Sequence, residues 1–252
     1  MKKITILVLL LMLVVGLNKS RAQEQLVLNN IQKKIDLAVY RDNDIKQVNA
    51  MLDSLSVLQK KSNNSLLDYW KAYAEYNVAI LYGQEEKKKD LAKKSLETGI
   101  KDIEGVKRKR SEDYALLCIM KGLELNYLNF LEVPFSAKKV EEAGLKAIEL
   151  DSNNLRAQLA YGIYDFYTPK MFGGGKKVEK ILKKAISLND SYDSNPYAPT
   201  WGKDLAYSYL IRYYERIGEK QKAKDTYKES LEKLGSRPII ELFNPFKEKS
   251  TK

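Results

Sequence analysis

The chain of 252 residues carries 44 lysines and arginines against 33 aspartates and glutamates, which gives a formal net charge of +11. It contains no histidine, so Ser-His-Asp and Cys-His catalytic sets are excluded and the commonest side-chain ligand of transition metals is absent. A single cysteine excludes an intramolecular disulfide. We therefore expect no metal site and no cofactor, and a carboxylate-based enzyme remains possible.

The first residues, 1–22, have the pattern of a secretory signal peptide. A basic pair precedes an apolar run, residues 4–17, that is too short to span a bilayer comfortably. Small residues follow at the positions that signal peptidase reads, Ser20 and Ala22. We predict cleavage before Gln23 and no membrane-spanning segment in the mature chain. An uncleaved N-terminal anchor is the alternative, and because no cysteine follows the run, a lipoprotein anchor is not expected.

Removing this segment lowers the net charge from +11 to +7. Lysines alternate with glutamates in stretches such as 85–97 and 219–233, a pattern typical of solvated helix faces with charge pairs four residues apart. The densest basic cluster, residues 107–110, lies between two helical patterns. An exported protein seldom meets chromosomal DNA, so we expect no nucleic-acid partner.

From Glu24 onward the sequence reads as a succession of amphipathic helices, with apolar residues three and four positions apart and almost no strand pattern. Breakers such as Asn63, Pro134 and Gly218 separate them. We predict helices over Glu24–Tyr40, Asp44–Ser62, Leu66–Leu81, Lys87–Val106, Ser111–Leu131, Ala137–Leu150, Asn154–Tyr167, Lys176–Leu188, Gly202–Ile217 and Lys220–Leu234.

The second helix of each predicted pair repeats one pattern of small residues. A small or β-branched residue is followed four positions later by an apolar or small one, and three positions after that by a small one. This spacing places all three on one face of a helix, where a neighbouring helix can approach closely. The sets are Ala92/Leu96/Gly99, Val140/Gly144/Ala147, Val178/Leu182/Ala185 and Ala223/Tyr227/Ser230, and the small residues expected opposite them on the first helices are Ala74, Gly122, Gly162 and Ser208.

This pattern resembles the second half of the tetratricopeptide repeat (TPR). The last predicted pair matches best, with Tyr214 on its first helix and Gly218 in its turn. The resemblance covers about Leu66–Leu234 and implies an α-solenoid of about four helix pairs. The last residues of the four sets are 48, 38 and 45 positions apart along the chain, whereas one repeat of the family has about 34 residues. We therefore expect a degenerate array with insertions. An unrelated all-α bundle, which also needs small residues at helix crossings, is the alternative.

We therefore predict an all-α fold, a degenerate TPR-like helical-hairpin array preceded by capping helices. The predicted domains are a signal peptide at 1–22, N-terminal capping helices at 23–65, a TPR-like repeat domain at 66–237 and a C-terminal tail at 238–252. The apolar part of the tail, Ile239–Phe246, is expected to cover the last pair.

The segment 167–177, "YTPKMFGGGKK", suggests at first a phosphate-binding loop. Such a loop needs a preceding strand and a hydroxyl residue after its lysine, whereas here a helical pattern precedes the segment and Lys176 is followed by Lys177. We predict a turn in which Pro169 ends one helix, the glycines permit positive φ, and Phe172 packs back between the two helices. An anion held by free N–H groups at the start of the next helix stays open.

A narrower resemblance rests on the run 147–188, followed by 199–203 and 206–231. These segments resemble a group of exported TPR-like proteins of Gram-negative bacteria. They are similar, more distantly, to the periplasmic T-component of TRAP transporters, in which a proline and a glycine pair form a corner inside a helix pair. The resemblance implies a periplasmic α-helical protein that binds a partner or ligand and is not an enzyme.

Aromatic residues supply the candidate binding surface: seven of the 17 tyrosines lie on two predicted first helices, Asn154–Tyr167 and Gly202–Ile217. First helices of repeat solenoids line the concave groove, and tyrosine offers area and a hydroxyl at low entropic cost. Core packing of these aromatic residues between repeats is the alternative. Trp201 is expected either at the groove's rim or packed at the start of its helix. The candidate residues are Tyr161, Tyr164, Asp165, Trp201, Tyr209 and Tyr213.

The leading hypothesis is an exported TPR-like scaffold that binds a protein or peptide partner through a concave, tyrosine-rich groove. A periplasmic small-molecule or lipid binding protein, similar to the T-component, is the alternative, with the aromatic residues enclosing a cavity. A carboxylate enzyme rests only on Asp165 with Glu215 or Asp190, and acidic residues at helix ends are normally caps.

Overall fold

The computed structural model describes residues 22–191 and 195–246, and no β-strand occurs among them. Residues 1–21 of the predicted signal peptide lie outside this range. Within the two described stretches, no helix combines the length and apolar character needed to cross a membrane. After a short helix over 22–28, the longer elements are α2 (Ile31–Asp36), the π-helical turn η1 (Leu37–Arg41), α3 (Ile45–Gln59), α4 (Ser65–Gly83), α5 (Lys89–Gly105), α6 (Ser111–Glu124), α7 (Val133–Leu150), α8 (Leu155–Tyr167), α9 (Val178–Ser187), α10 (Lys203–Arg216), α11 (Lys220–Leu234) and α12 (Pro238–Glu241).

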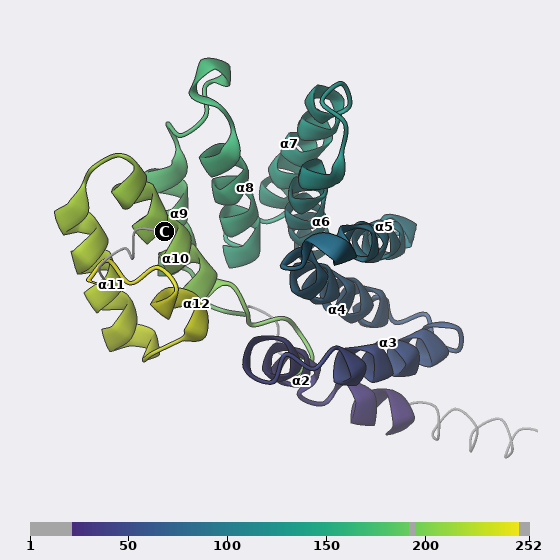
Figure 1. The fold of residues 1–252 in the computed structure, drawn as a ribbon. Helices are drawn as coiled ribbons and strands as arrows, with labels where there is room; N and C mark the ends of the chain where they lie inside the picture. The colour runs from purple at the N-terminus through teal and green to yellow at the C-terminus, as the bar shows by residue number, and fades with distance from the viewer. Residues whose placement is uncertain (1–21, 192–194, 247–252) are drawn as a thin grey trace, which may run out of the picture.

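From α4 onward the helices pack as consecutive pairs, α4 with α5, α6 with α7, α8 with α9, and α10 with α11 (Figure 1). Helices α2 and α3 pack on α4 and cover the N-terminal end of the array. These contacts confirm the predicted all-α, TPR-like helical-hairpin array.

The array curves because its two layers of helices are not equally spaced. The first helices of neighbouring pairs, α4, α6, α8 and α10, pack against one another more closely than the second helices do. An arch closes on the side where its members lie closer together. Figure 1 accordingly shows α4, α6, α8 and α10 on the inner side and α5, α7, α9 and α11 on the outer side.

Small residues at the helix crossings explain how the pairs approach. The residues of the repeated pattern on α5, α7, α9 and α11 are buried. A Cβ added to Gly162 on α8 would stand only 2.7 Å from Leu182 Cδ2 on α9, and one added to Gly144 would stand 3.1 Å from the Tyr161 ring. At Gly122 the nearest atom would be 3.7 Å away, an ordinary contact. The predicted register is therefore right, and α8 and α9 cross closely at Gly162.

Two predicted helix boundaries are wrong. Helix α6 ends at Glu124 instead of Leu131, and α7 begins at Val133, four residues earlier than predicted. Pro134, expected to separate the helices, lies in the first turn of α7, where its missing N–H has no partner to lose. The predicted first helix is interrupted at Asn30, which adopts a left-handed φ of 55°.

The glycine-rich segment forms the predicted turn between α8 and α9. Thr168 is extended, and Gly173 and Gly175 adopt φ values of 86° and 80°, which favour glycine. The prediction that Phe172 packs between the helices is wrong, because 72% of its surface is exposed. The turn instead closes on its own backbone, with the Gly175 N–H donating to the Asp165 carbonyl at 2.9 Å, and the Phe172 side chain lies outside it.

The connection between α9 and α10 returns to the first helix pair. Trp70 Nε1 on α4 donates to the Tyr197 carbonyl at 2.9 Å, and Trp201 Nε1 donates to the Tyr69 hydroxyl at 2.9 Å. Figure 1 shows this connection passing close to α2 and α4. Residues more than 120 positions apart are thereby joined, so the first helix pair is held to the connection that leads into the last pair.

One buried arginine links three parts of the array. Arg156, at the start of α8, is 1% exposed and holds the Glu112 carboxylate of α6 with two hydrogen bonds of 2.5 and 2.7 Å. Its Nη1 donates to the carbonyls of Asp190 and Trp201 at 2.8 Å each. A buried charge is tolerated only when it is paired and hydrogen-bonded in this way.

The last pair is covered by the segment that follows it. Helix α12 packs on α10, and Ile240 is fully buried. The Tyr227 hydroxyl of α11 donates to Glu241 Oε1 at 2.9 Å, and the Phe246 ring lies 5.9 Å from the Tyr227 ring. The apolar face of the last pair therefore does not end in solvent.

Candidate functional site

Aromatic side chains gather around one arginine on the inner helices. We call this group the inner cluster: Phe166, Tyr167, Tyr209, Arg212 and Phe243. The Arg212 guanidinium lies 4.7 Å from the ring centre of Tyr209, 4.8 Å from that of Phe243 and 5.1 Å from that of Phe166. Its Nη2 donates to the Tyr167 hydroxyl at 3.1 Å. Cation–π contacts on several sides fix the direction of the guanidinium.

The rings of the inner cluster pack edge to face. The Tyr209 ring lies 5.4 Å from Phe166 and 6.0 Å from Tyr167, at interplanar angles of 81° and 78°. The Tyr167 and Tyr209 hydroxyls are 3.4 Å apart. Phe166 is buried, whereas 58% of the Tyr167 surface is exposed. The cluster therefore has a packed base and an exposed rim that carries hydroxyl groups.

Two tyrosines extend this surface toward the N-terminal half. Desolvation raises the pKa of Tyr76 on α4, and the nearby phenols of Tyr40 and Tyr167 raise it further. The pKa of Tyr40 on η1 is also raised, by desolvation first and then by Asp36 and Asp204. Even so, 47% of the Tyr40 surface is exposed. Tyr76 therefore lies near Tyr40 and near Tyr167 of the inner cluster.

The predicted candidates Tyr161 and Tyr164 lie elsewhere on α8. Their rings stack 5.7 Å apart, with an interplanar angle of 17°. Tyr161 is buried against Gly144 of α7, and Lys177 Nζ lies 3.4 Å from its hydroxyl. Tyr164 is partly buried and lies near Glu141 of α7. Both rings therefore fill the space between α8 and the outer helices.

Asp165 anchors the turn that follows α8. It is buried, and its Oδ2 accepts a hydrogen bond from the Lys177 N–H at 2.8 Å. The Asp165 carboxylate therefore accepts from the N–H group before α9, where the sequence had left open the binding of an external anion. Asp190 does not join it, because the Asp190 carbonyl contacts Arg156 near the other end of α8, about 14 Å along the helix axis.

The remaining candidates differ in their surroundings. Trp201 is buried and packs at the start of α10, with the Arg156 guanidinium 5.9 Å from its ring centre. Tyr213 is partly buried, and its ring lies 5.8 Å from that of Tyr214. Tyr209 is the predicted candidate that belongs to the inner cluster. The partner contacts of these residues stay a prediction.

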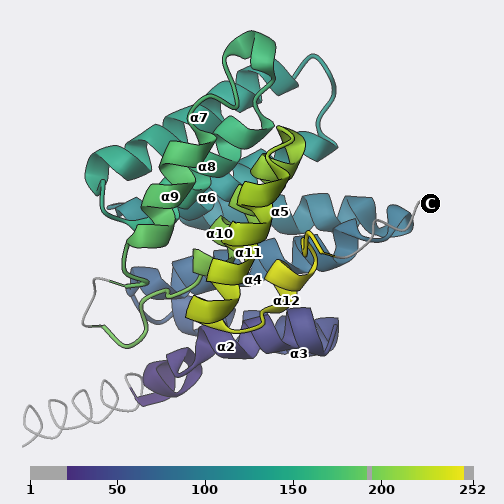
Figure 2. The same cartoon turned by 90° about the vertical axis from the view of Figure 1, so that its left-hand side faces the viewer.

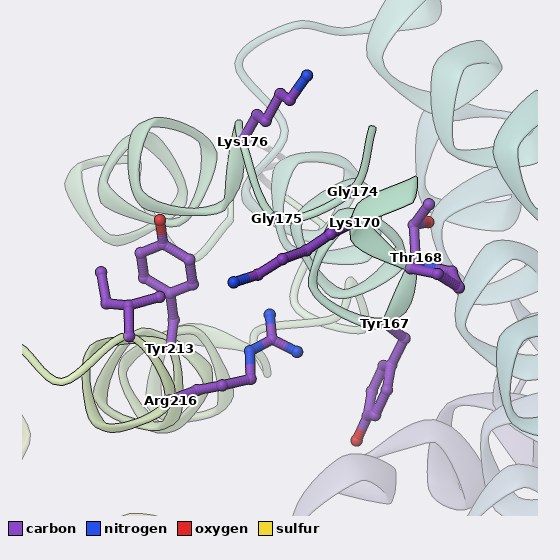
Figure 3. A pocket seen from close by; sticks show the side chains of 10 residues that line it. Tyr167, Thr168, Lys170, Gly174, Gly175, Lys176, Tyr213 and Arg216 are labelled. Atoms are coloured by element: carbon purple, nitrogen blue, oxygen red, sulfur yellow. The ribbon is translucent and has the colours of Figure 1, made fainter. Parts of the chain in front are cut away.

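A pocket of about 430 Å³ lies between the glycine-rich turn and the end of α10. Its lining residues are Tyr167, Thr168, Pro169, Lys170, Gly174, Gly175, Lys176, Tyr213, Arg216 and Ile217, with no carboxylate among them. Figure 3 shows Lys170 and Arg216 extending into the pocket and Lys176 extending away from it. Arg216 is held by a 2.7 Å hydrogen bond from its Nη1 to the Phe166 carbonyl. The pocket is therefore cationic.

Sequence reasoning missed Arg212 and the two N-terminal tyrosines as candidates. Arg212 follows Tyr209 by three residues, a spacing that places both on one helix face and that could have identified it. Tyr40 and Tyr76 are separated from α10 by more than 120 positions. Only the curvature of the array brings their elements near it, and no local pattern reports that curvature.

Comparisons with known proteins agree with the fold. No protein-family model matches the sequence, and no curated protein matches it significantly. Among solved structures, the crystal structure of a thermophilic TPR protein from Thermus thermophilus is similar, with a TM-score of 0.56 and 15% sequence identity. The match covers 84% of this chain and 95% of that chain. At this identity the likeness shows the fold alone: the chain is a TPR-like all-α array.

Proposed function

We propose that this chain is an exported scaffold that binds a protein or peptide segment along the inner side of its arch. The observation that carries the proposal is the inner cluster, in which Arg212 is fixed among aromatic rings while the Tyr167 rim stays exposed. TPR-like folds generally serve protein interaction, which supports the same reading by analogy of fold.

The chemistry of the inner cluster suits an extended peptide. Tyr167 and Tyr209 offer ring faces for apolar side chains and hydroxyl groups for backbone hydrogen bonds. Arg212 has further N–H donors beyond the one that it gives to Tyr167. Because the rings are already packed around the guanidinium, a partner would find these groups in place and little ordering would be needed on binding.

Within this proposal the predicted candidates divide by exposure. Tyr209 and Tyr213 keep part of their surface accessible, so they are the candidates that a partner on the inner side can touch directly, whereas Tyr161 and Tyr164 pack toward α7. Asp165 and Trp201 are buried in contacts of their own. We propose that these two shape the binding surface by holding the glycine-rich turn and the start of α10.

We also propose that the protein works in the periplasm after removal of residues 1–22. The basic pair, the apolar run and the small residues before Gln23 support export. Cell fractionation with an intact-mass measurement tests this part. A periplasmic protein whose mass begins at Gln23 is the expected result, and a cytoplasmic protein that retains Met1 would contradict it.

The binding proposal is tested by affinity. The protein is purified with its partner at native expression, the partner is identified by mass spectrometry, and its affinity is measured for Tyr167→Ala, Arg212→Ala and the outer-face control Lys94→Ala. Residues at the centre of an interface cost at least about tenfold in affinity on truncation. We expect that loss for both inner variants and no loss for the control.

An unchanged affinity of both inner variants, with melting temperatures like that of the parent chain, would contradict the proposal. Native mass spectrometry of the freshly purified protein separates the alternative function. If a small molecule or lipid is found bound repeatedly in place of a protein partner, the result would favour the alternative, a small-molecule or lipid binding protein.

A further inference from the structure

Two turns of the array present large apolar side chains to solvent. The turn between α6 and α7 carries Phe130 and Leu131, and the first turn of α7 carries Phe135; these side chains are 88%, 79% and 77% exposed. The turn between α8 and α9 carries Met171 and Phe172, which are 83% and 72% exposed. Single exposed apolar residues are ordinary, but a group of this size on neighbouring elements marks an interaction surface.

Both turns lie at the same edge of the array. Helices α7 and α8 are neighbours joined by the short connection 151–154, so they run in opposite directions, and Glu141 at the middle of α7 lies close to Tyr164 near the end of α8. The start of α7 and the end of α8 are therefore side by side. Figures 1 and 2, which are turned by 90° from one another, both show the two turns together at the top of the molecule.

The charge beside these side chains is positive. Residues 166–178 contain three lysines and no carboxylate. Lys170 and Arg216 extend into the carboxylate-free pocket behind the turn, and Lys170 directly precedes Met171 and Phe172 in the chain (Figure 3). A pocket that holds two cationic groups without a carboxylate suits a phosphate.

The region of the other turn includes the start of α7, which adds exposed lysines at 138 and 139. Its carboxylates are partly engaged, since Glu132 accepts a hydrogen bond from the Asn129 N–H at 3.0 Å and Glu142 lies 3.9 Å from Lys138. Apolar side chains at the tips, with cationic groups set just behind them, have the layered order of a lipid interface: acyl chains first, then phosphates.

The shape of this edge favours a bilayer over a folded protein. A stable protein interface needs a continuous, complementary surface of about 800 Å² on each partner. Protruding turns offer separate side chains instead of such a surface. A fluid bilayer closes around each side chain, so it needs no complementary shape, and aromatic residues are favoured at its interface.

We propose that this edge docks on a lipid bilayer with anionic phosphates. Phe130, Leu131, Phe135, Met171 and Phe172 enter the interface, while Lys170 and Arg216 hold a lipid phosphate. None of these side chains belongs to the inner cluster, so variants can test the docking separately from the proposed partner binding.

Vesicle binding tests the proposal. The protein is purified as cells process it, and its binding to phosphatidylglycerol-containing and pure phosphatidylcholine vesicles is measured by flotation. The variant Phe135→Ser/Met171→Ser/Phe172→Ser keeps the charge of the chain and is expected to bind anionic vesicles at least about tenfold more weakly. Leu242→Ser, at a position just after α12 that is 74% exposed, is the matched control and is expected to bind like the parent.

A charge-reversal pair tests two lysines of the glycine-rich turn, Lys170 in the pocket and Lys176 beside it. Lys170→Glu/Lys176→Glu should weaken binding to anionic vesicles by at least about tenfold, whereas Lys94→Glu/Lys101→Glu on the outer helix α5 should weaken it much less. Inorganic phosphate should release the protein no better than sodium chloride of equal ionic strength. Release by phosphate alone would assign the pocket to a free anion and overturn the proposal.

Insertion itself is read by a tryptophan placed in the turn. Trp70 and Trp201 are buried, so Phe172→Trp adds an exposed reporter. Its emission is expected to shift to the blue with anionic vesicles and to be quenched by brominated lipids. No shift, no vesicle binding, or equal binding of the apolar-turn variant and the parent would each overturn the proposal.

Discussion

Arg156 is the residue on which the packing of α6, α8 and the following connection depends. Replacing it with methionine leaves the Glu112 carboxylate and two backbone carbonyls without their donor. Breaking a buried pair by removing one partner costs about 3–5 kcal/mol, and we expect Arg156→Met to lower the free energy of unfolding by that amount in urea titrations.

The control for this variant is an exposed pair on α7. Lys138 lies 3.9 Å from Glu142, and exposed pairs contribute at most about 1 kcal/mol. Lys138→Met should therefore have little effect. If both variants unfold at the same urea concentration, the buried network does not hold the array together.

Gly162 tests the register of the crossing between α8 and α9. A Cβ at this position would stand 2.7 Å from Leu182 Cδ2, so Gly162→Leu should destabilise the chain by about 1–3 kcal/mol through overpacking. Gly122→Ala is the control, because its Cβ would find open contact at 3.7 Å and glycine inside a helix costs about 0.5–1 kcal/mol relative to alanine. Thermal melts should shift in opposite directions; a stable Gly162→Leu variant would mean that the register is wrong.

Glu75 makes stability depend on pH. Desolvation raises its pKa from 4.5 to about 7, although a hydrogen bond with Ser95 and the charge of Lys71 oppose the rise. Between these pH values the unfolded chain has lost the Glu75 proton while the folded chain retains it. Stability therefore falls as pH rises through this window, and it is greatest below pH 4.5 as far as this group is concerned.

The measurement compares unfolding of the parent and Glu75→Gln from about pH 5 to 8. Because the glutamine has no proton to lose, the parent should lose on the order of 2 kcal/mol relative to the variant across this range. Asp36, whose pKa is raised to about 6 mainly by desolvation, acts in the same direction in both chains. Identical pH profiles for the two chains would show that Glu75 is not desolvated in the fold.

Among the elements, α12 closes the C-terminal end. Ile240 is fully buried, and truncation of a buried isoleucine to alanine costs about 2–5 kcal/mol. Because a repeat contacts mainly its neighbours, Ile240→Ala should speed hydrogen exchange in α10 and α11 and leave α5 unchanged. Leu242→Ala, at a 74% exposed position, is the control. Uniformly faster exchange along the whole chain would argue against α12 as a local cap.

The elements also show where sequence reasoning succeeds. Helix positions and crossing residues such as Gly162 were predictable because a period of about 3.6 residues is a local property. Pro134 misled the prediction because proline both ends helices and begins them, and its neighbours do not say which. The prediction for Phe172 was wrong because the backbone of a turn decides whether its side chains point inward or outward. Here the turn closes with a hydrogen bond from the Gly175 N–H to the Asp165 carbonyl, and Phe172 points outward.

For the candidate site the sequence was less informative. Tyr209 was identified with its helix, yet Tyr161 and Tyr164 share the tyrosine pattern and pack toward α7 instead. The difference depends on which side of α8 faces the interior of the arch, and that side is set by the curvature of the whole array. Arg212 became a candidate only when the rings of α8 and α10 were seen together.

At the scale of the whole molecule, the array is tied into a closed arch. Trp70 and Trp201 join α4 to the connection before α10 through hydrogen bonds across more than 120 residues. An open solenoid has only contacts between neighbouring repeats. This tie fixes the inner side as one surface, on which partner binding is proposed, and leaves the apolar edge free for a different contact.

The central claim is that a partner binds on the inner side, and site-specific photo-crosslinking tests it most directly. A photoreactive phenylalanine derivative replaces Tyr167 on the inner helix α8 or, in a separate chain, Leu145 on the outer helix α7; these positions are 58% and 47% exposed. We predict that one recurrent protein is crosslinked in cells through position 167 and not through position 145. Equal crosslinking through both positions, or none through position 167 at native expression, would contradict the claim.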